Sequence, residues 1–512
     1  MSRYPRSRAV SVLALTATGA LALAACSSSD TPGGGEDAPQ ELVVGVTTDV
    51  DTLVPWTATQ FQAVNVLQNL YGSLTEFDSD LAVVPGLAEE WETSEDGLTV
   101  TFHLRDDVTF TDGSEFDAED VVASYTTIMD EETAAVSAAN LASVENIEAT
   151  DERTVTFTLS APDASLPSKL APVTLAILPS DVDLDALESE PVGTGPFALD
   201  ARTPNESLVL ASNPDYWRGA PELDTVEFRV IPDQSAIVSA LQAGNVHMSV
   251  FDDPLVADTI GGSVTVTETP QLGYHVLQMN ARTAPLDDRD VRLAIACAID
   301  RQEVLDTAAL GAGEVTGPIT SPAFRSDPSA RPCPEGDPAT AREYLAAAGY
   351  EDGLTLSAIV MQDGYATAVA EAENIQAQLA EVGITLEIEA LESGSYVDRW
   401  IAADFELAVA LNGGQPDPDA MYGRYFPSHG NLNTVAGYSS DTLDDLFAQG
   451  QAELDPDARV AIYDEISREL ENQAAWVWMF TSYNYTATAE GVSGFTPMPN
   501  NSLQYLRDTT IQ

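Results

Sequence analysis

Apolar residues alternate with polar ones over several short stretches of this chain. Between 98 and 104, Leu, Val, Phe and Leu occupy every second position, and Thr, Thr and His fill the gaps. This period of two predicts a half-buried strand. A valine-rich run at 41–46 predicts a buried strand that opens the folded part, and the polar, proline-containing segment 49–56 ends it.

Helical spacing and helix-boundary residues follow the predicted strands. Asp117 is placed to cap a helix whose apolar face carries Val121, Val122, Tyr125, Ile128 and Met129. Asp337 and Asp455, each followed by proline, have the pattern that begins helices. A helix over 366–382 leads at Gly383 into another alternating strand. Strands interleaved with helices favour an α/β fold, and no repeat of 20 to 50 residues indicates a solenoid.

The first 26 residues have the pattern of a secretory targeting segment. Three arginines precede an apolar run over 9–25, which is shorter than the ~20 residues that span a bilayer comfortably. The run ends in Leu-Ala-Ala-Cys, which resembles the lipobox of bacterial lipoproteins. The sequence therefore predicts a lipoprotein signal peptide over 1–26, a flexible tether over 27–40, and anchoring to the outer face of the cell membrane through a lipid on Cys26.

Composition bounds the size of the core and excludes one class of partner. The 512 residues carry 82 Asp and Glu against 21 Lys and Arg, a formal net charge of −61. The acids are spread along the chain, so nucleic acid is an unfavourable partner. Lys169 is the only lysine, so nearly every cationic residue is an arginine. This usage fits a high-GC genome such as an actinobacterial one. A hydrophobic content of 44% and this length predict at least two globular cores.

Two cysteines follow Cys26 in the sequence. Cys297 falls on a predicted helix and Cys333 in a proline-rich loop. Disulfides persist outside the cytoplasm, so the pair is either bridged or present as two free thiols. The sequence leaves both alternatives open.

Several blocks occur in an order that resembles one protein family. The most specific runs from Pro-Gly-Leu-Ala-Glu-Glu-Trp at 85–91, through Asp-Gly-Leu-Thr at 96–99 and Phe-His-Leu-Arg at 102–105, to Ala-Glu-Asp-Val-Val at 118–122. Further blocks are Gly-Thr-Gly-Pro-Phe at 193–197, Asn-Pro-Asp-Tyr-Trp at 213–217 and Asp-Pro-Asp at 417–419. With these blocks the chain resembles the family 5 solute-binding lipoproteins of bacterial ABC importers for peptides and nickel, over about residues 42–500.

The resemblance implies a two-lobed α/β fold of the type II periplasmic-binding-protein kind, with a hinged cleft. The first lobe would span 41–271 with an extra subdomain over about 80–190, and the second lobe 272–487. Residues 488–512 would return to the first lobe. The implied function is to bind a peptide or similar small solute in the cleft and to deliver it, as a monomer without a cofactor, to ABC permease and ATPase subunits.

The family lines its cleft with the loop after the first strand, residues near the hinge, and the loop before Asp-Pro-Asp. The resemblance therefore implies a set of ligand-binding candidates: Trp56, Gln60, Phe61, Tyr274, its neighbour His275, Asn412, Gln415, Asp417 and Tyr422. Dipeptide binders of the family also place an Asp a few residues before Asp-Pro-Asp to hold the ligand's amine. Gly414 stands there in this chain, so simple dipeptide recognition is in doubt unless Asp417 or Asp419 replaces that anchor.

Other functional classes have weaker support. His429 is the candidate ligand for a chelated metal such as nickel, but the chain has only four histidines and no His or Cys cluster. A secreted enzyme is disfavoured because the motifs of zinc peptidases, serine hydrolases and phosphate loops are absent from the sequence. A receptor that presents its ligand for signalling, and a binder of another small organic solute, remain alternatives.

Overall fold

The computed structural model describes residues 39–362 and 364–512. The predicted signal peptide with Cys26, and all but the last residues of the predicted tether, lie outside this range. Within the described part, no helix is both long enough and apolar enough to cross a membrane.

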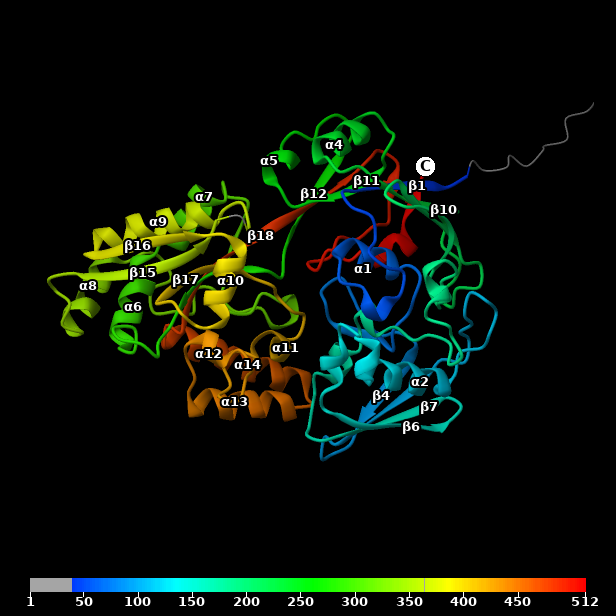
Figure 1. The fold of residues 1–512 in the computed structure, drawn as a ribbon, viewed down its shortest axis with the longest axis horizontal. Helices are drawn as coiled ribbons and strands as arrows, with labels where there is room; N and C mark the ends of the chain where they lie inside the picture. The colour runs from blue at the N-terminus through cyan, green and yellow to red at the C-terminus, as the bar shows by residue number, and fades with distance from the viewer. Residues whose placement is uncertain (1–38, 363) are drawn as a thin grey trace, which may run out of the picture. The chain divides into compact units, whose positions relative to one another are not determined.

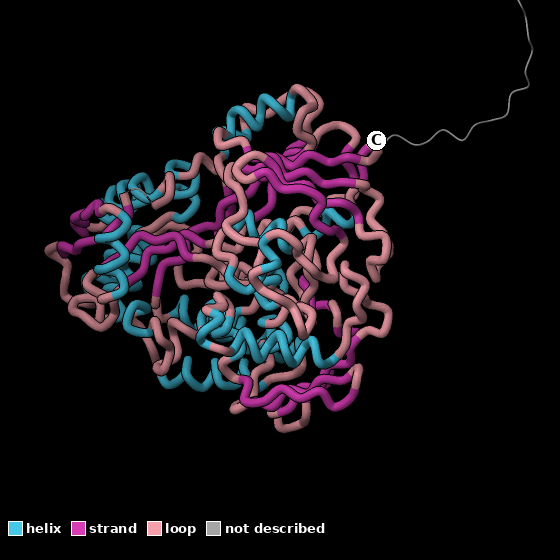
Figure 2. Tube along the Cα trace, turned by 45° about the vertical axis from the view of Figure 1, so that its right-hand side comes forward, coloured by secondary structure: helices cyan, strands magenta, loops and turns pink. Residues whose placement is uncertain are grey.

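One large mixed sheet runs through the described part of the chain (Figures 1 and 2). From one edge to the other, its strands are β16 (Ile384–Leu391), β15 (Leu354–Met361), β17 (Leu407–Asn412), β13 (Tyr274–Met279), β18 (Trp476–Thr488), β11 (Met248–Phe251), β1 (Glu41–Val46), β10 (Thr225–Val230), β9 (Ser207–Ser212) and β8 (Phe197–Thr203). Two further strands, β12 (Thr265–Pro270) and β14 (Gly313–Val315), pair with the central strand β18.

The strand β18 joins two lobes that have separate hydrophobic cores. Its residues 476–480 pair with β13, whereas its residues 485–488 pair with β11 and β12. The core of the first lobe includes Leu42, Phe102 and Leu210, and the cores of the second lobe include Leu277, Ile375 and Trp476. The two-lobed α/β fold expected from the resemblance is therefore confirmed, while the lobe boundaries given above stay predictions.

The first lobe adds a small antiparallel sheet of order β4-β5-β7-β6 to its part of the large sheet. Strand β5 buries Val100, Phe102 and Leu104, so the alternation read from the sequence marks its inner face. Outside the large sheet, the α-helices and strands of this lobe are α1 (Phe61–Leu67), β2 (Thr75–Phe77), β3 (Val83–Pro85), β4 (Ala88–Thr93), β5 (Thr99–Leu104), α2 (Ala118–Met129), β6 (Val144–Asp151), β7 (Thr154–Leu159), α3 (Leu166–Lys169), α4 (Gln234–Gln242) and α5 (Pro254–Ala257).

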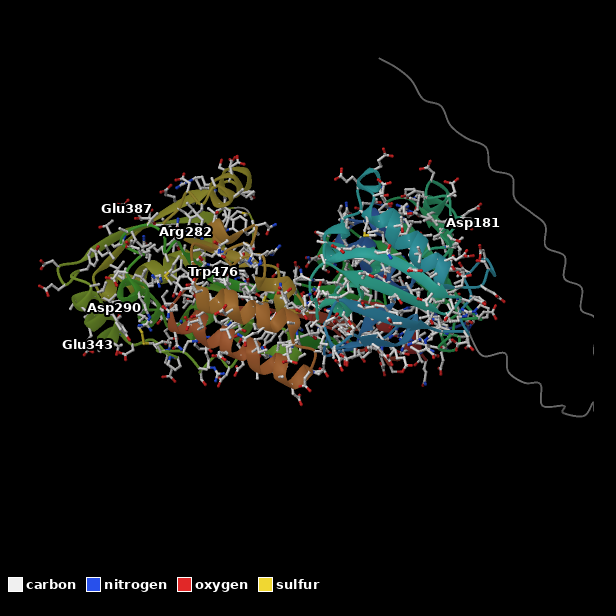
Figure 3. All side chains as sticks on the ribbon, turned by 90° about the horizontal axis from the view of Figure 1, so that it is seen from below. Asp181, Arg282, Asp290, Glu343, Glu387 and Trp476 are labelled. Carbon is white, nitrogen blue, oxygen red and sulfur yellow. A yellow bond between two sulfur atoms is a disulfide. The ribbon has the colours of Figure 1, made fainter. Side chains whose placement is uncertain are left out.

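In the second lobe, helices cover both faces of the sheet. Alternate residues of β15 face opposite ways: Val360 packs in the core that contains α9, and Ile359 packs against Tyr396 of α10. The helices are α6 (Arg289–Ala298), α7 (Arg301–Ala308), α8 (Pro338–Ala347), α9 (Ala368–Glu381), α10 (Ser393–Ile401), α11 (Pro418–Tyr422), α12 (Asn433–Ala436), α13 (Asp441–Ala452) and α14 (Pro456–Asn472). Figure 3 shows Trp476 within this lobe, whereas the exposed acids Glu343 and Glu387 lie at its periphery.

The residues after β18 return to the first lobe. Leu503 and Leu506, at the 3₁₀ helix Gln504–Asp508, are buried in the core that contains Leu42. The terminal strands β19 (Val492–Ser493) and β20 (Thr510–Ile511) pair with each other. This return places the side chains of residues 500–507 beside α1, where they contribute to the site described below.

Cys297 and Cys333 are joined by a disulfide in the structure, with an S–S distance of 2.01 Å and a Cα–Cα distance of 5.1 Å. The bond ties α6 to the loop before α8, and both side chains belong to the second-lobe core. We expect no reactive thiol from these two cysteines in denatured, unreduced protein that starts after Cys26, and two after reduction. Thiol titration with and without reductant measures this, and two thiols without reductant would show that the bond is absent.

Candidate functional site

A cavity of about 300 Å³ lies between the two lobes. One wall comes from α1 and the segment 168–174 of the first lobe, and the facing wall from the loop between β17 and α11 of the second lobe. Residues after β18 close one side. The polar lining residues are Asn65, Gln68, Ser73, Glu76, Asn140, Ser168, Lys169, Thr174, Gln415, Asp417, Asn500, Gln504 and Arg507.

The second-lobe wall is held by a buried ion pair. Asp417 caps α11 by accepting a hydrogen bond from the backbone N–H of Asp419. Its two carboxylate oxygens also accept hydrogen bonds from Arg459 of α14, at 2.6 Å and 2.9 Å. Burial alone would lower the pKa of the guanidinium, but the hydrogen bonds to Asp417 raise the pKa of Arg459 above its ordinary value. The charge of Asp417 is therefore compensated within the protein.

The only lysine of the chain lies where the two lobes meet. Lys169 Nζ is 2.7 Å from Asp163 Oδ2 in the first lobe and 3.9 Å from Asp419 Oδ2 in the second. Beside it, the backbone N–H of Ala164 donates to the carbonyl of Gln451, whose side chain donates to Asp419. We call Asp163, Ala164, Lys169, Asp419 and Gln451 the interlobe bridge. It is a polar contact that depends on the lobes lying close together.

The pKa values of the two carboxylates in the interlobe bridge shift in opposite directions. Burial would raise the pKa of Asp163, but the Lys169 ammonium and the hydroxyls of Ser165 and Ser143 outweigh it and leave the pKa below its ordinary value. For Asp419, burial dominates and raises the pKa, and the more distant ammonium offsets only part of that increase. Lys169 thus stabilises the charge of Asp163 more than that of Asp419.

The opposite side of the cavity also contains paired charges. Glu76 Oε2 lies 2.8 Å from Arg507 Nη1 and 3.0 Å from Arg218 Nη2. Around these ion pairs the lining is rich in amides, which tie the first lobe to the C-terminal residues. The Gln68 side chain accepts from Ser502, and the Gln504 side chain donates to the carbonyl of Phe77. The cavity therefore offers many hydrogen-bonding groups. Both acids among its described lining residues, Glu76 and Asp417, are paired with arginines.

Two of the candidates from the sequence, Gln415 and Asp417, line this cavity. The structure also accounts for Gly414. A Cβ built there would lie 1.9 Å from the carbonyl oxygen of Leu272, so no side chain fits at that position in this conformation. Asp417 is bound to Arg459, and Asp419 is buried at the interlobe bridge. Neither acid is free to take the place of the missing amine anchor.

The other candidates lie elsewhere. Trp56 is buried and donates its indole N–H to the carbonyl of Ala176. Tyr274 and Tyr422 are fully buried and pack together, and Asn412 donates to the Tyr274 hydroxyl while lining a separate, more apolar cavity. Gln60 is exposed at the start of α1 and lines neither cavity, and the side chain of Phe61 lies outside what the structure describes.

Neither sequence-predicted histidine lines the cavity. His275 is buried, with its ring nitrogens 2.8 Å from Glu371 Oε1 and 3.0 Å from Ser482 Oγ. His429 is exposed between α11 and α12. Over the described residues, no group of three or more His, Cys, Asp or Glu side chains is arranged to hold a metal ion.

Sequence reasoning missed Asn65, Lys169 and Arg507, because each meets its partners only through the tertiary fold. Lys169 carried one signal, since it is the sole lysine of the chain. Asn65 and Arg507 carry no local pattern that separates them from other polar residues of short helices.

Comparison with known proteins agrees with this architecture. The glutathione-binding protein GsiB of Escherichia coli strain K12 is 26% identical over 499 residues, which covers 93% of this chain and 95% of the relative. The structure of HbpA2 from Haemophilus parasuis superposes with a TM-score of 0.84 at 25% identity and covers 92% of this chain and all of the other. The binding protein DppA from Helicobacter pylori, solved with the peptide STSA, gives 0.71 at 26% identity, over 92% of this chain and 98% of that one.

The family assignment rests on the middle of the chain. Residues 82–433 match the family described as bacterial extracellular solute-binding proteins, family 5, and the match includes the first-lobe sheet β4-β5-β7-β6 and the wall formed by Gly414 and Asp417. It spans more than half of the sequence and contributes residues to both lobes. The chain belongs to the family 5 bacterial extracellular solute-binding proteins.

Proposed function

We propose that this protein is the substrate-binding subunit of an ABC importer and that it binds a peptide or a similar small solute between its lobes. The observation that carries the proposal is a cavity whose walls come from both lobes and whose lining is rich in amides. A peptide-like ligand matches such a lining, because its backbone offers alternating N–H donors and C=O acceptors. Similarity to a glutathione-binding protein and to a peptide complex supports the same ligand class.

The proposed mechanism requires no chemical step from this chain. The lobes are joined at two crossing segments, where Thr481 donates to the carbonyls of Gln271 and Gly273. Ligand contacts that exist only when the lobes are close would stabilise the closed form, which would then dock on the permease. The interlobe bridge at Lys169 already joins the two lobes in the structure. The ATPase subunits would supply the energy, and a lipid on Cys26 would keep the monomeric protein at the outer face of the membrane.

Ligand binding to this cavity is expected to stabilise the fold measurably. A ligand at ~100 times its dissociation constant adds about 2.7 kcal/mol to the free energy of unfolding. The measurement is a thermal-shift screen of the protein against di- to octapeptides including glutathione, with oligosaccharides, nickel chelates and haem as other classes. Stabilisation by peptides alone supports the proposal, whereas stabilisation only by another class would reassign the ligand.

A variant of the cavity wall makes the screen specific to this site. Thr174 lines the cavity, and replacing it by Trp would fill much of the space without changing a charge. Peptide stabilisation should disappear in Thr174→Trp if the variant itself still unfolds cooperatively. Unchanged stabilisation would place the ligand elsewhere.

A further inference from the structure

A second compartment of about 180 Å³ adjoins the cavity between the lobes, and Asn65 lines both. Its walls come from the carboxyl end of β1, from α1, β10, β11 and the first turn of α4, and from the segment after β18, with Asn484 of β18 at the hinge side. In Figure 1, β1, β11 and α4 lie next to one another on the first lobe. No residue named from the sequence as a ligand candidate lines this compartment.

Three wall residues carry buried polar atoms that have no hydrogen-bond partner: Asn65 Oδ1, Gln234 Oε1 and Asn484 Nδ2. The side chains of Asn65 and Asn484 belong to residues that are only 8% and 2% exposed. Buried polar groups are nearly always paired in folded proteins, so a cluster of unpaired ones requires an explanation. Two of these atoms are acceptors and one is a donor, which defines what a partner molecule would have to supply.

Charge distinguishes this compartment from the main cavity. Asp252 is exposed at its wall, and its carboxylate accepts a hydrogen bond from Gln234 Nε2 at 3.3 Å. Among the described residues, no Lys, Arg or His forms an ion pair with Asp252. The two acids of the main cavity, Glu76 and Asp417, are both bound to arginines. Of these two compartments, the second therefore offers a ligand cation a carboxylate that no described cation compensates, and the main cavity does not.

We propose that the second compartment binds the ammonium group of the ligand. An ammonium has three N–H donors, and the compartment offers three acceptors: the Asp252 carboxylate, Asn65 Oδ1 and Gln234 Oε1. The unpaired Nδ2 of Asn484 would donate to the first carbonyl oxygen of the ligand. The remainder of the ligand would pass Asn65 into the main cavity. The inference rests on the proposed function and names the ligand class as solutes with a free amino terminus.

This placement also explains how a ligand amine could be held although no acid stands at Gly414. The loop before Asp417 has no room for an anchoring side chain, and its neighbouring acids are already paired or buried. The amine anchor would therefore sit on the first lobe, at the end of β1, and the ligand would lie with its amino end there. A charge-assisted hydrogen bond at Asp252 then replaces the one that Gly414 cannot provide.

The test uses a library of unmodified tri- to hexapeptides and the same library acetylated at the amino terminus, with binding measured by calorimetry. Asp252→Asn is expected to weaken binding of the unmodified peptides about 10- to 100-fold. Asp253→Asn is the matched control: it removes the same charge one residue away, lines neither cavity and keeps a residue able to cap α5. It should change binding by less than about twofold.

The acetylated library separates loss of the ammonium site from general damage. Acetylation should weaken binding to the wild type about 10- to 100-fold and have little further effect on Asp252→Asn. A second variant, Gln234→Met, keeps the size of the side chain, removes Oε1 and should weaken unmodified peptides more than acetylated ones. Equal binding of unmodified peptides by the wild type and Asp252→Asn would overturn this inference and leave the proposed function intact. Failure of every peptide to bind the wild type would overturn both.

Discussion

Replacing Arg459 by methionine is expected to lower the free energy of unfolding by about 3–5 kcal/mol, because the carboxylate of Asp417 would stay buried without its counter-charge. The two side chains are only 8% and 5% exposed, and two hydrogen bonds join them. Arg459 also donates to the carbonyl of Gly450 in α13. Its removal would therefore loosen α11, α13 and α14 against one another. Urea unfolding of the two proteins at pH 7 measures the difference.

A control on the same helix tests whether burial is the cause. Arg468 is also in α14 and pairs with Asp464 four residues earlier, but both side chains are about half exposed. Arg468→Met should cost less than about 1 kcal/mol. The double variant Asp417→Asn, Arg459→Met should recover part of the loss, since it no longer buries an unpaired charge. A loss in Arg459→Met no larger than that in Arg468→Met would contradict the assignment of a buried, stabilising pair.

For Asp417, the local sequence pattern indicates its role in helix capping but not its ion pair with Arg459. Asp followed by Pro at 337 and 455 predicted helix starts, and both acids cap helices in the structure. The same pair at Asp417 was interpreted through the family resemblance as part of a ligand site. In the structure it caps α11 in the same way, and both of its carboxylate oxygens accept hydrogen bonds from Arg459. The Asp-Pro pattern thus marks a helix start at this position as well, although no helix was predicted there, and Asp417 lines the cavity mainly as a structural support.

Positions that depend on long-range packing were not predictable from local patterns. Trp56 follows the first strand and was expected in the cleft, but the short helix Pro55–Thr57 turns it inward to bond Ala176. Lys169 lies near Asp419, which is far away in the sequence. Asp252 and Asn484 belong to a wall that is assembled from several elements. The alternation and capping rules describe single strands and helices. They carry no information on which elements meet across the interlobe cavity.

Replacing Lys169 by methionine is expected to cost about 3 kcal/mol at neutral pH, the lower end of the range for a broken buried pair because Lys169 is one-fifth exposed. Asp163 and Asp419 are each only 6% exposed as side chains, and the variant would leave both without a nearby ammonium. The matched control is Arg342→Met, which removes an exposed cation that donates to the carbonyl of Glu381. That control should lie within about 0.5 kcal/mol of the wild type. Urea unfolding measures all three proteins.

The pH dependence of this deficit follows from the two carboxylates. In the wild type the pKa of Asp163 is lowered, so its contribution to stability is present above the ordinary value near 4 and is lost as the pH falls through the lower, folded-state value. Without the ammonium, burial would raise the pKa of Asp163 and raise that of Asp419 further, so both acids would take up protons more readily when folded. The difference between the wild type and Lys169→Met should therefore be full at pH 7 and shrink as the pH falls through about 4. A difference that stays constant down to pH 3 would show that Lys169 contributes through packing and not through its charge.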